Sequence, residues 1–249
     1  MENNTEEIKK HISKEITIVG SIIMLLIGLC SIVILYRFDN IERLLTKPKQ
    51  DTLAVNLPKN FNYAYDILKS YNKHIDTNTV IKITQTANYF SLSNNKKSFK
   101  TILGQLLAES GAKHILNDKV LTSNQGAIGI GQILPNSGYG YLIKRCTNVD
   151  RLIFKYLGCD DVSFVFNGDL SKSRKVYKMK EWLQDETNNI ALWGFIMKKT
   201  IDLNHGNVNK ALISYNSGSG GLQNYIDSGG SLKNHDYIVS INQKLNLNN

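Results

Sequence analysis

The chain has 249 residues, of which 42% are hydrophobic and 20% charged, and its formal net charge is +9 at pH 7. This composition allows one folded domain of ordinary size with additional segments, and it excludes a disordered chain. The positive charge could attract nucleic acid, anionic lipid or an anionic wall polymer. However, Lys96, Lys97 and Lys100 form the nearest approach to a basic patch. An evenly basic surface is therefore the better interpretation, and no nucleic-acid partner is expected.

Residues 16–36 contain no charged side chain. About 20 such residues suffice for a helix to cross a bilayer core, so we predict a single transmembrane helix here. A cleaved signal peptide would need a shorter apolar core followed by small residues, whereas Tyr36-Arg37-Phe38-Asp39 follows this run. Basic residues flank both sides, so charge alone does not set the orientation. Residues 37–58 are predicted to be a stalk, because two prolines break any long helix.

Residues 59–249 are predicted to form one mainly α-helical domain. Apolar residues recur at helical spacing in several stretches, and alternating strand patterns are scarce, Val162–Phe166 being the only good one. Asn207 is a plausible N-cap, Gly218 follows the end of a helix, and Gly194 would let a neighbouring helix approach closely. The predicted helices begin at about residue 60 and then cover residues 77–90, 97–110, 187–202 and 208–216.

Three cysteines and five histidines show no metal-binding spacing, so neither a metal nor another cofactor is expected. Cys30 lies in the apolar segment. Cys146 and Cys159 could form a disulfide if this part of the chain faces an oxidising compartment. Two free thiols are the alternative.

Glu109 stands at the end of the helix predicted for residues 97–110, at the edge of its apolar stripe. A partly desolvated carboxyl there would have a raised pKa, as a general acid requires near neutral pH. Taken alone, such a residue is more often a solvated glutamate at a helix end with no catalytic role. Two further segments change this balance.

The first segment is the glycine-rich loop GAIGIGQILP, residues 126–135. Its glycines let the backbone approach a ligand closely, and Gln132 can both donate and accept hydrogen bonds, as an amide-bearing sugar would require. The second is ALISYNSGSGGL, residues 211–222. Tyr215 lies there on the buried helix face, and its hydroxyl needs a partner. A glycine-rich turn and a core tyrosine are the ordinary interpretations of either segment alone.

Together with Glu109-Ser110 and with Asn189-Ile190 followed by Gly194, these motifs occur in the order found in family 1 lytic transglycosylases. Residues 97–226 resemble the soluble-lytic-transglycosylase or goose-type-lysozyme-like group. The resemblance implies a lysozyme-like α-helical fold with a substrate groove. It also implies cleavage of peptidoglycan between N-acetylmuramic acid and N-acetylglucosamine, leaving 1,6-anhydro ends.

The resemblance makes Glu109 the single general acid and base. Tyr215 would hydrogen-bond Glu109, and Asn189 and Asn216 would shape the same wall. Asp118 is the only nearby candidate for a second carboxylate, and it falls in an apparent loop. The remaining residues that the resemblance places around the cleaved bond are Ser110, Ser123, Gly129, Ile130 and Gln132.

The chain departs from the family pattern in five places. Gly131 replaces the usual methionine, and Ser219 replaces a common proline. Gly194 comes one residue late, where Trp193 stands, which weakens the assignment of Asn189. The segment between Glu109 and Gly126, which contains Ser123, is several residues longer than usual. An insertion at about residues 138–182 could form a lid, a partner-docking loop or a disulfide-stapled flap.

Two other functions are compatible with the sequence: a lysozyme-type hydrolase, and a catalytically silent wall-binding scaffold of an envelope-spanning machine. Because peptidoglycan lies outside the cytoplasmic membrane, the catalytic domain is expected on the extracytoplasmic side. Residues 1–15 would then be a cytoplasmic tail. The same site would serve secretion or conjugation machinery, phage entry or wall turnover.

Overall fold

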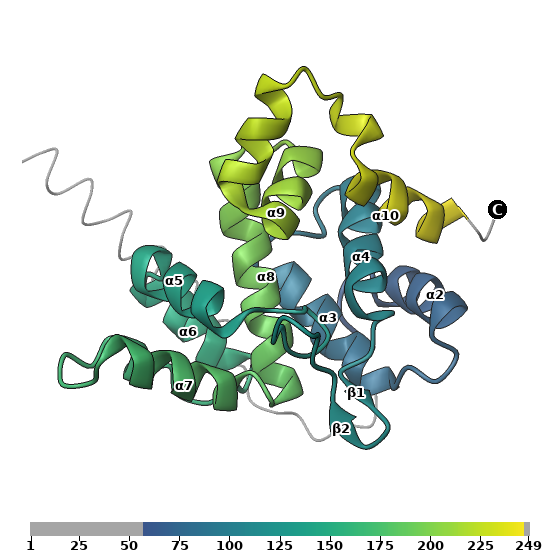
Figure 1. Cartoon of the computed structure of the whole chain (residues 1–249). Coiled ribbons are helices and arrows are strands. Elements are labelled where there is room, and N and C mark those ends of the chain that lie inside the picture. Colours follow the sequence, from purple (N-terminus) through teal and green to yellow (C-terminus); the bar gives the residue numbers. More distant parts are fainter. Residues whose placement is uncertain (1–56, 247–249) are drawn as a thin grey trace, which may run out of the picture. The chain divides into compact units, whose positions relative to one another are not determined.

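Helix α8 (Glu186–Leu203) runs through the middle of the fold in the computed structural model, which describes residues 57–246 (Figure 1). It confirms the helix predicted for residues 187–202. Asp185 caps its start by accepting a hydrogen bond from the Asn188 backbone N–H at 2.9 Å. Ile190, Trp193 and Phe195 are all fully buried, because other helices surround α8. A mainly helical domain is therefore confirmed for the described residues.

The other elements pack around α8 or join its neighbours. Strands β1 and β2 form a short antiparallel hairpin, and η1 and η2 are single 3-10 turns. The elements besides α8 are, in chain order, α2 (Phe61–Tyr71), α3 (Thr77–Tyr89), α4 (Lys96–Ser110), β1 (Ile115–Leu116), β2 (Lys119–Val120), α5 (Pro135–Arg145), α6 (Asn148–Tyr156), η1 (Ser163–Val165), α7 (Lys172–Trp182), α9 (Val208–Asp227), η2 (Leu232–Asn234) and α10 (Asp236–Asn246).

The predicted membrane segment at residues 16–36 and most of the predicted stalk at residues 37–58 lie outside the described residues. Within residues 57–246, no helix is both long and apolar enough to cross a membrane.

Two glycines set the distances between neighbouring helices. At Gly194, a Cβ would lie 2.2 Å from Cγ2 of Thr86, so glycine lets α3 pack directly on α8. At Gly104, a Cβ would lie 2.9 Å from side-chain atoms of both Ile241 and Leu245, so glycine lets α10 pack directly on α4. The predicted role of Gly194 is confirmed. The packing of α10 on α4 matters for the site described below.

Helix α4 confirms the clearest helix prediction. Asn95 caps its start, accepting from the backbone N–H groups of Lys97 and Ser98, and Gly111 ends it with φ of +63°. Its apolar stripe, which includes Phe99, Leu103 and Leu107, is buried. Helix α9 begins as predicted, with Asn207 accepting from the Lys210 N–H at 3.1 Å. It continues to Asp227 beyond a sharp kink at Gly218, where φ is +74° and ψ is 169°.

The insertion at residues 138–182 is a helical layer, formed by most of α5 together with α6, η1 and α7. Its side chains Phe154, Met179 and Trp182 belong to the main hydrophobic core. Asp150 pairs with Lys199 of α8 at 3.0 Å and thereby ties α6 to the central helix. Of the three forms considered for the insertion, the disulfide-stapled flap does not fit, because Cys146 and Cys159 are free.

One local prediction within the insertion was wrong, and of the two alternatives for its cysteines the free thiols are found. Residues 162–166 do not form a strand, because the Asp161 side chain accepts from the Ser163 N–H at 2.9 Å and a 3-10 turn follows. Cys146 and Cys159 are free thiols. Cys159 packs against α8, with its Sγ 3.9 Å from the Thr187 carbonyl oxygen, and burial raises the pKa of its thiol to about 12.

Candidate active site

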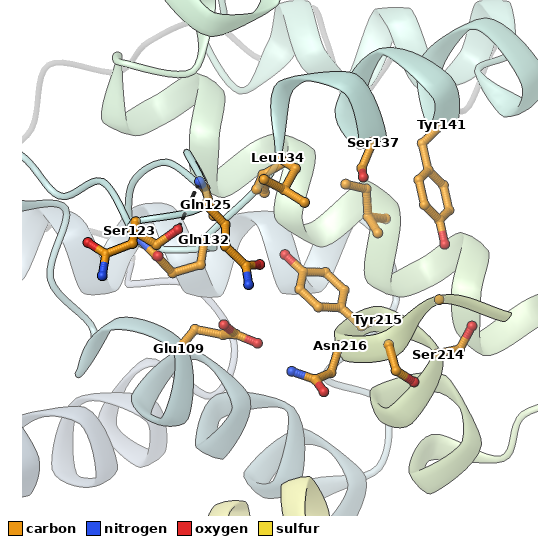
Figure 2. A pocket seen from close by; sticks show the side chains of 16 residues that line it. Glu109, Ser123, Gln125, Gln132, Leu134, Ser137, Tyr141, Ser214, Tyr215 and Asn216 are labelled. Carbon is orange, nitrogen blue, oxygen red and sulfur yellow. Dashed lines mark hydrogen bonds between the residues drawn. The ribbon is translucent and has the colours of Figure 1, made fainter. Parts of the chain in front are cut away.

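A cavity of about 710 Å³ opens where the end of α4 meets the glycine-rich loop, α5, α8 and α9. Figure 2 shows that Glu109, Gln132, Tyr215 and Asn216 reach this space from three separate segments. The residues that line the cavity are Glu109, Ser123, Asn124, Gln125, Ala127, Gln132, Ile133, Leu134, Ser137, Tyr141, Ile196, Ser214, Tyr215, Asn216, Ser217 and Gly218.

Within residues 57–246, Glu109 is the only charged residue that lines the cavity. Burial raises the pKa of its carboxyl above the usual value, because desolvation disfavours the charged form. The Tyr237 hydroxyl and the nearby amide of Gln105 oppose this shift, because both favour the charged carboxylate, but the net direction is upward. The cavity thus contains, among the described residues, one carboxyl group whose pKa is shifted in the direction that favours a proton donor.

The tyrosine that hydrogen-bonds Glu109 is Tyr237, not Tyr215 as expected. The Tyr237 hydroxyl, at the start of α10, donates to Oε1 of Glu109. The Tyr215 hydroxyl instead donates to the carbonyl oxygen of Gly131 at 2.7 Å. Burial, followed by the nearby Glu109 charge, raises the pKa of both phenols well above the usual value, so both remain hydrogen-bond donors.

Asn189 supports the glycine-rich loop from behind and does not line the cavity. It is fully buried; its Oδ1 accepts from the Gly131 N–H at 3.0 Å, and its Nδ2 donates to the Ile128 carbonyl at 2.9 Å. Gly129, with φ of +70°, lies so close that a Cβ there would be 2.5 Å from the Asn189 Nδ2. Asn189 and Gly129 are therefore not among the residues that line the cavity, and their observed contacts hold the loop.

Ser110 and Ile130 also lie behind the cavity wall. The Ser110 hydroxyl donates to the Ile130 carbonyl at 2.8 Å and so joins the end of α4 to the loop. Ile130 is fully buried. Neither residue is among those that line the cavity, and the contact between them is structural.

Four expected substrate-binding residues do line the cavity: Ser123, Gln132, Tyr215 and Asn216. The Ser123 hydroxyl accepts from the Ala127 N–H at 3.0 Å. Gln132 has a positive φ of 47°, and its Nε2 donates to the Gly129 carbonyl at 2.8 Å. Asp118 is exposed in the turn of the β1–β2 hairpin and does not line the cavity.

The sequence did not indicate that α5 would provide a wall of the site. Ser137 and Tyr141 lie on one side of this helix and reach the cavity (Figure 2). The Tyr141 hydroxyl is also 3.2 Å from the hydroxyl of Thr200 on α8. The spacing of positions 137 and 141, one helical turn apart, was the available signal, but only the fold shows which way that face points.

Gly131 and Trp193, two departures from the family pattern, are neighbours. A Cβ at Gly131 would lie 3.0 Å from the Trp193 Cβ. The Trp193 indole N–H in turn donates to Oε1 of Gln105 on α4 at 2.6 Å. Trp193 therefore contacts both the loop and the helix that carries Glu109.

Comparison with protein-family models, with curated proteins and with solved structures finds no match to this chain.

Proposed function

We propose that this protein cleaves a glycan by acid–base catalysis, with Glu109 as the single general acid and base. More particularly, we propose that it is a peptidoglycan lytic transglycosylase with a lysozyme-like fold. The main support is that Glu109 is the only carboxylate that the described part of the chain places in the cavity lining, with a pKa raised by burial.

A single carboxylate favours this reaction over ordinary glycoside hydrolysis. Hydrolases of the common type use two carboxylates about 5–10 Å apart, one of which activates water or attacks the sugar. A transglycosylase needs no second carboxylate, because a hydroxyl of the substrate takes the place of water.

The rest of the lining suits a neutral, amide-bearing sugar. Amide side chains and hydroxyl groups can both donate and accept hydrogen bonds, as N-acetyl and hydroxyl groups of a glycan require. The amide and hydroxyl side chains of the cavity are Ser123, Asn124, Gln125, Gln132, Ser137, Tyr141, Ser214, Tyr215, Asn216 and Ser217.

The proposed reaction has two proton transfers through one residue. Glu109 first protonates the bridging oxygen as the bond from C1 of N-acetylmuramic acid to that oxygen breaks, and the N-acetyl group of the same sugar stabilises the cationic centre. The C6 hydroxyl then attacks C1 and returns its proton to Glu109. The product carries a 1,6-anhydro ring, and Glu109 is again protonated.

This function would place the domain outside the cytoplasmic membrane, anchored through residues 16–36, where it meets glycan strands. The substrate, the anchor and this location belong to the proposal.

The test is digestion of purified peptidoglycan by the full-length protein, with mass spectrometry of the products. We expect anhydro-muropeptides from the wild type and none from Glu109→Gln. Glu181→Gln, an exposed position on α7, is the matched control and should retain activity. Reducing-end products would indicate a lysozyme-type hydrolase. No products from folded wild-type protein would contradict catalysis and favour the scaffold function.

A further inference from the structure

A fully buried amide lies one helical turn before Glu109. Gln105 and Glu109 are four residues apart on α4, so their side chains share one face of the helix. Gln105 has no exposed surface. Its Oε1 accepts the hydrogen bond from the Trp193 indole N–H at 2.6 Å. A glutamine in such a position requires an explanation, because burying a polar amide is costly.

The bond with Trp193 fixes which end of the amide faces Glu109. An indole N–H can only donate, so the amide must present its oxygen to Trp193. Its Nε2 is therefore turned away from Trp193, and it has no hydrogen-bond partner within residues 57–246. The Gln105 amide lowers the pKa of three neighbouring groups, namely the Glu109 carboxyl and the phenols of Tyr215 and Tyr237.

We propose that Gln105 is a positioning residue for Glu109, held by Trp193 so that its amide N–H donates to the carboxylate when Glu109 has lost its proton. This inference rests on the proposed function, in which Glu109 gives up and regains a proton in each cycle. A buried donor without a partner is unfavourable while the acid is neutral. It becomes favourable when negative charge develops beside it, and a fixed donor needs no reorganisation at that moment.

Trp193 gives this arrangement its rigidity. Its side chain is fully buried, and its Cβ packs behind Gly131 of the glycine-rich loop. The Gly131 carbonyl also accepts from Tyr215. Trp193 therefore orients the Gln105 amide through its indole N–H and packs against the glycine-rich loop through its Cβ.

The experiment is a pH titration of the Glu109 carboxyl by NMR in the full-length protein, with ¹³C-labelled glutamate side chains. The Glu109 signal is assigned by its loss in Glu109→Gln. Gln105→Met keeps the length of the side chain but removes the donor. Trp193→Phe keeps an aromatic ring but releases the amide. Gln223→Met, an exposed glutamine on α9, is the matched control.

We expect Gln105→Met to move the titration midpoint of Glu109 upward by about one pH unit, because a hydrogen bond to the charged form is lost. Trp193→Phe should move it less in the same direction, and Gln223→Met should not move it. In peptidoglycan digestion, the fall of kcat/KM at high pH should shift with the midpoint. An unchanged midpoint in folded Gln105→Met, or in folded Trp193→Phe if the first variant does not fold, would overturn the proposal.

The two hypotheses fail in different ways. If the wild type cleaves peptidoglycan but the midpoint does not move, the positioning role of Gln105 is wrong and the proposed function stands. If the midpoint moves but the wild type releases no product, Gln105 does act on Glu109 and the proposed function is wrong.

Discussion

The Tyr237 hydroxyl donates a hydrogen bond to Glu109, although the two residues are separated by 128 positions in the sequence. Glu109 lies in the last turn of α4, and Tyr237 lies in the first turn of α10. The two helices pack directly against each other, because Gly104 has no side chain. The surroundings of the proposed acid therefore depend on contacts between helices that are distant in the chain.

Replacement of Tyr237 by phenylalanine should raise the pKa of Glu109 further, because the hydroxyl favours the charged carboxylate. We expect kcat/KM on peptidoglycan to fall about tenfold at the optimal pH, since hydrogen bonds to charged groups contribute about 1.5–3 kcal/mol. The fall of activity at high pH should also begin at a higher pH. Tyr225→Phe is the control, because the Tyr225 hydroxyl donates to the Ser231 carbonyl outside the cavity. Equal activity of Tyr237→Phe and wild type would contradict the role of this phenol.

Gly104→Ala tests the packing that places Tyr237. The new methyl group would lie 2.9 Å from the side chains of Ile241 and Leu245, so α10 must shift. We expect the free energy of unfolding to fall by about 1–3 kcal/mol, measured in urea, with a loss of activity. Gly220→Ala is the control, since a Cβ at Gly220 meets no atom within 4 Å. A stable Gly104→Ala variant with full activity would show that α10 tolerates displacement.

The raised pKa of Glu109 predicts the pH dependence of both activity and stability. Cleavage needs the protonated acid, so kcat/KM should fall as the pH rises through the raised pKa. For stability, a carboxyl whose pKa is higher in the folded protein binds its proton more tightly there. Its contribution to the free energy of unfolding is complete when the pH is below the pKa that the carboxyl has in the unfolded chain. That contribution is lost as the pH rises through the pKa that the carboxyl has in the folded protein.

Glu109→Gln should therefore be more stable than the wild type at neutral pH, with a Tm higher by about 2–4 °C for each kcal/mol of relieved desolvation. The difference should vanish below the unfolded pKa, which makes acidic pH an internal control. A thermal melt at both pH values is sufficient. A variant that is less stable than the wild type at neutral pH would mean that the ionised carboxylate is well solvated or well paired.

Asn189→Leu should destabilise the protein strongly. The fully buried amide accepts from Gly131 and donates to the carbonyls of Ile128 and Leu183, so its loss leaves several buried backbone groups unpaired. We expect the free energy of unfolding in urea to fall by about 3 kcal/mol or more. Asn224→Leu, at an exposed position on α9, should change it by less than about 0.5 kcal/mol. Similar values for the two variants would contradict the supporting role of Asn189.

Local sequence patterns were sufficient to predict the main helices. The apolar stripe of residues 97–110 and the pattern of residues 187–202 correspond to α4 and α8. The N-cap at Asn207 and the interruption of the helix at Gly218 were also predicted, because capping depends on neighbouring residues alone. By contrast, the alternation at residues 162–166 was misleading, since the Asp161 side chain starts a turn there.

The candidate site was only partly predictable, because local patterns do not show which distant segments come together. Glu109, Gln132 and Asn216 were identified from motifs and line one cavity. Tyr237 was missed, because nothing near it in the sequence indicates that α10 packs on α4. The choice between Tyr215 and Tyr237 as the partner of Glu109 depends on hydroxyl positions, which helical periodicity does not determine.

The position of Tyr237 has a consequence for biosynthesis. A chain grows from its N-terminus, and segments made early can fold before later ones appear. Every residue that lines the cavity precedes position 219, whereas the phenol that donates to Glu109 follows on α10. An emerging polypeptide therefore contains these lining residues before it contains the partner of its acid, and any product truncated before residue 237 carries Glu109 without that partner.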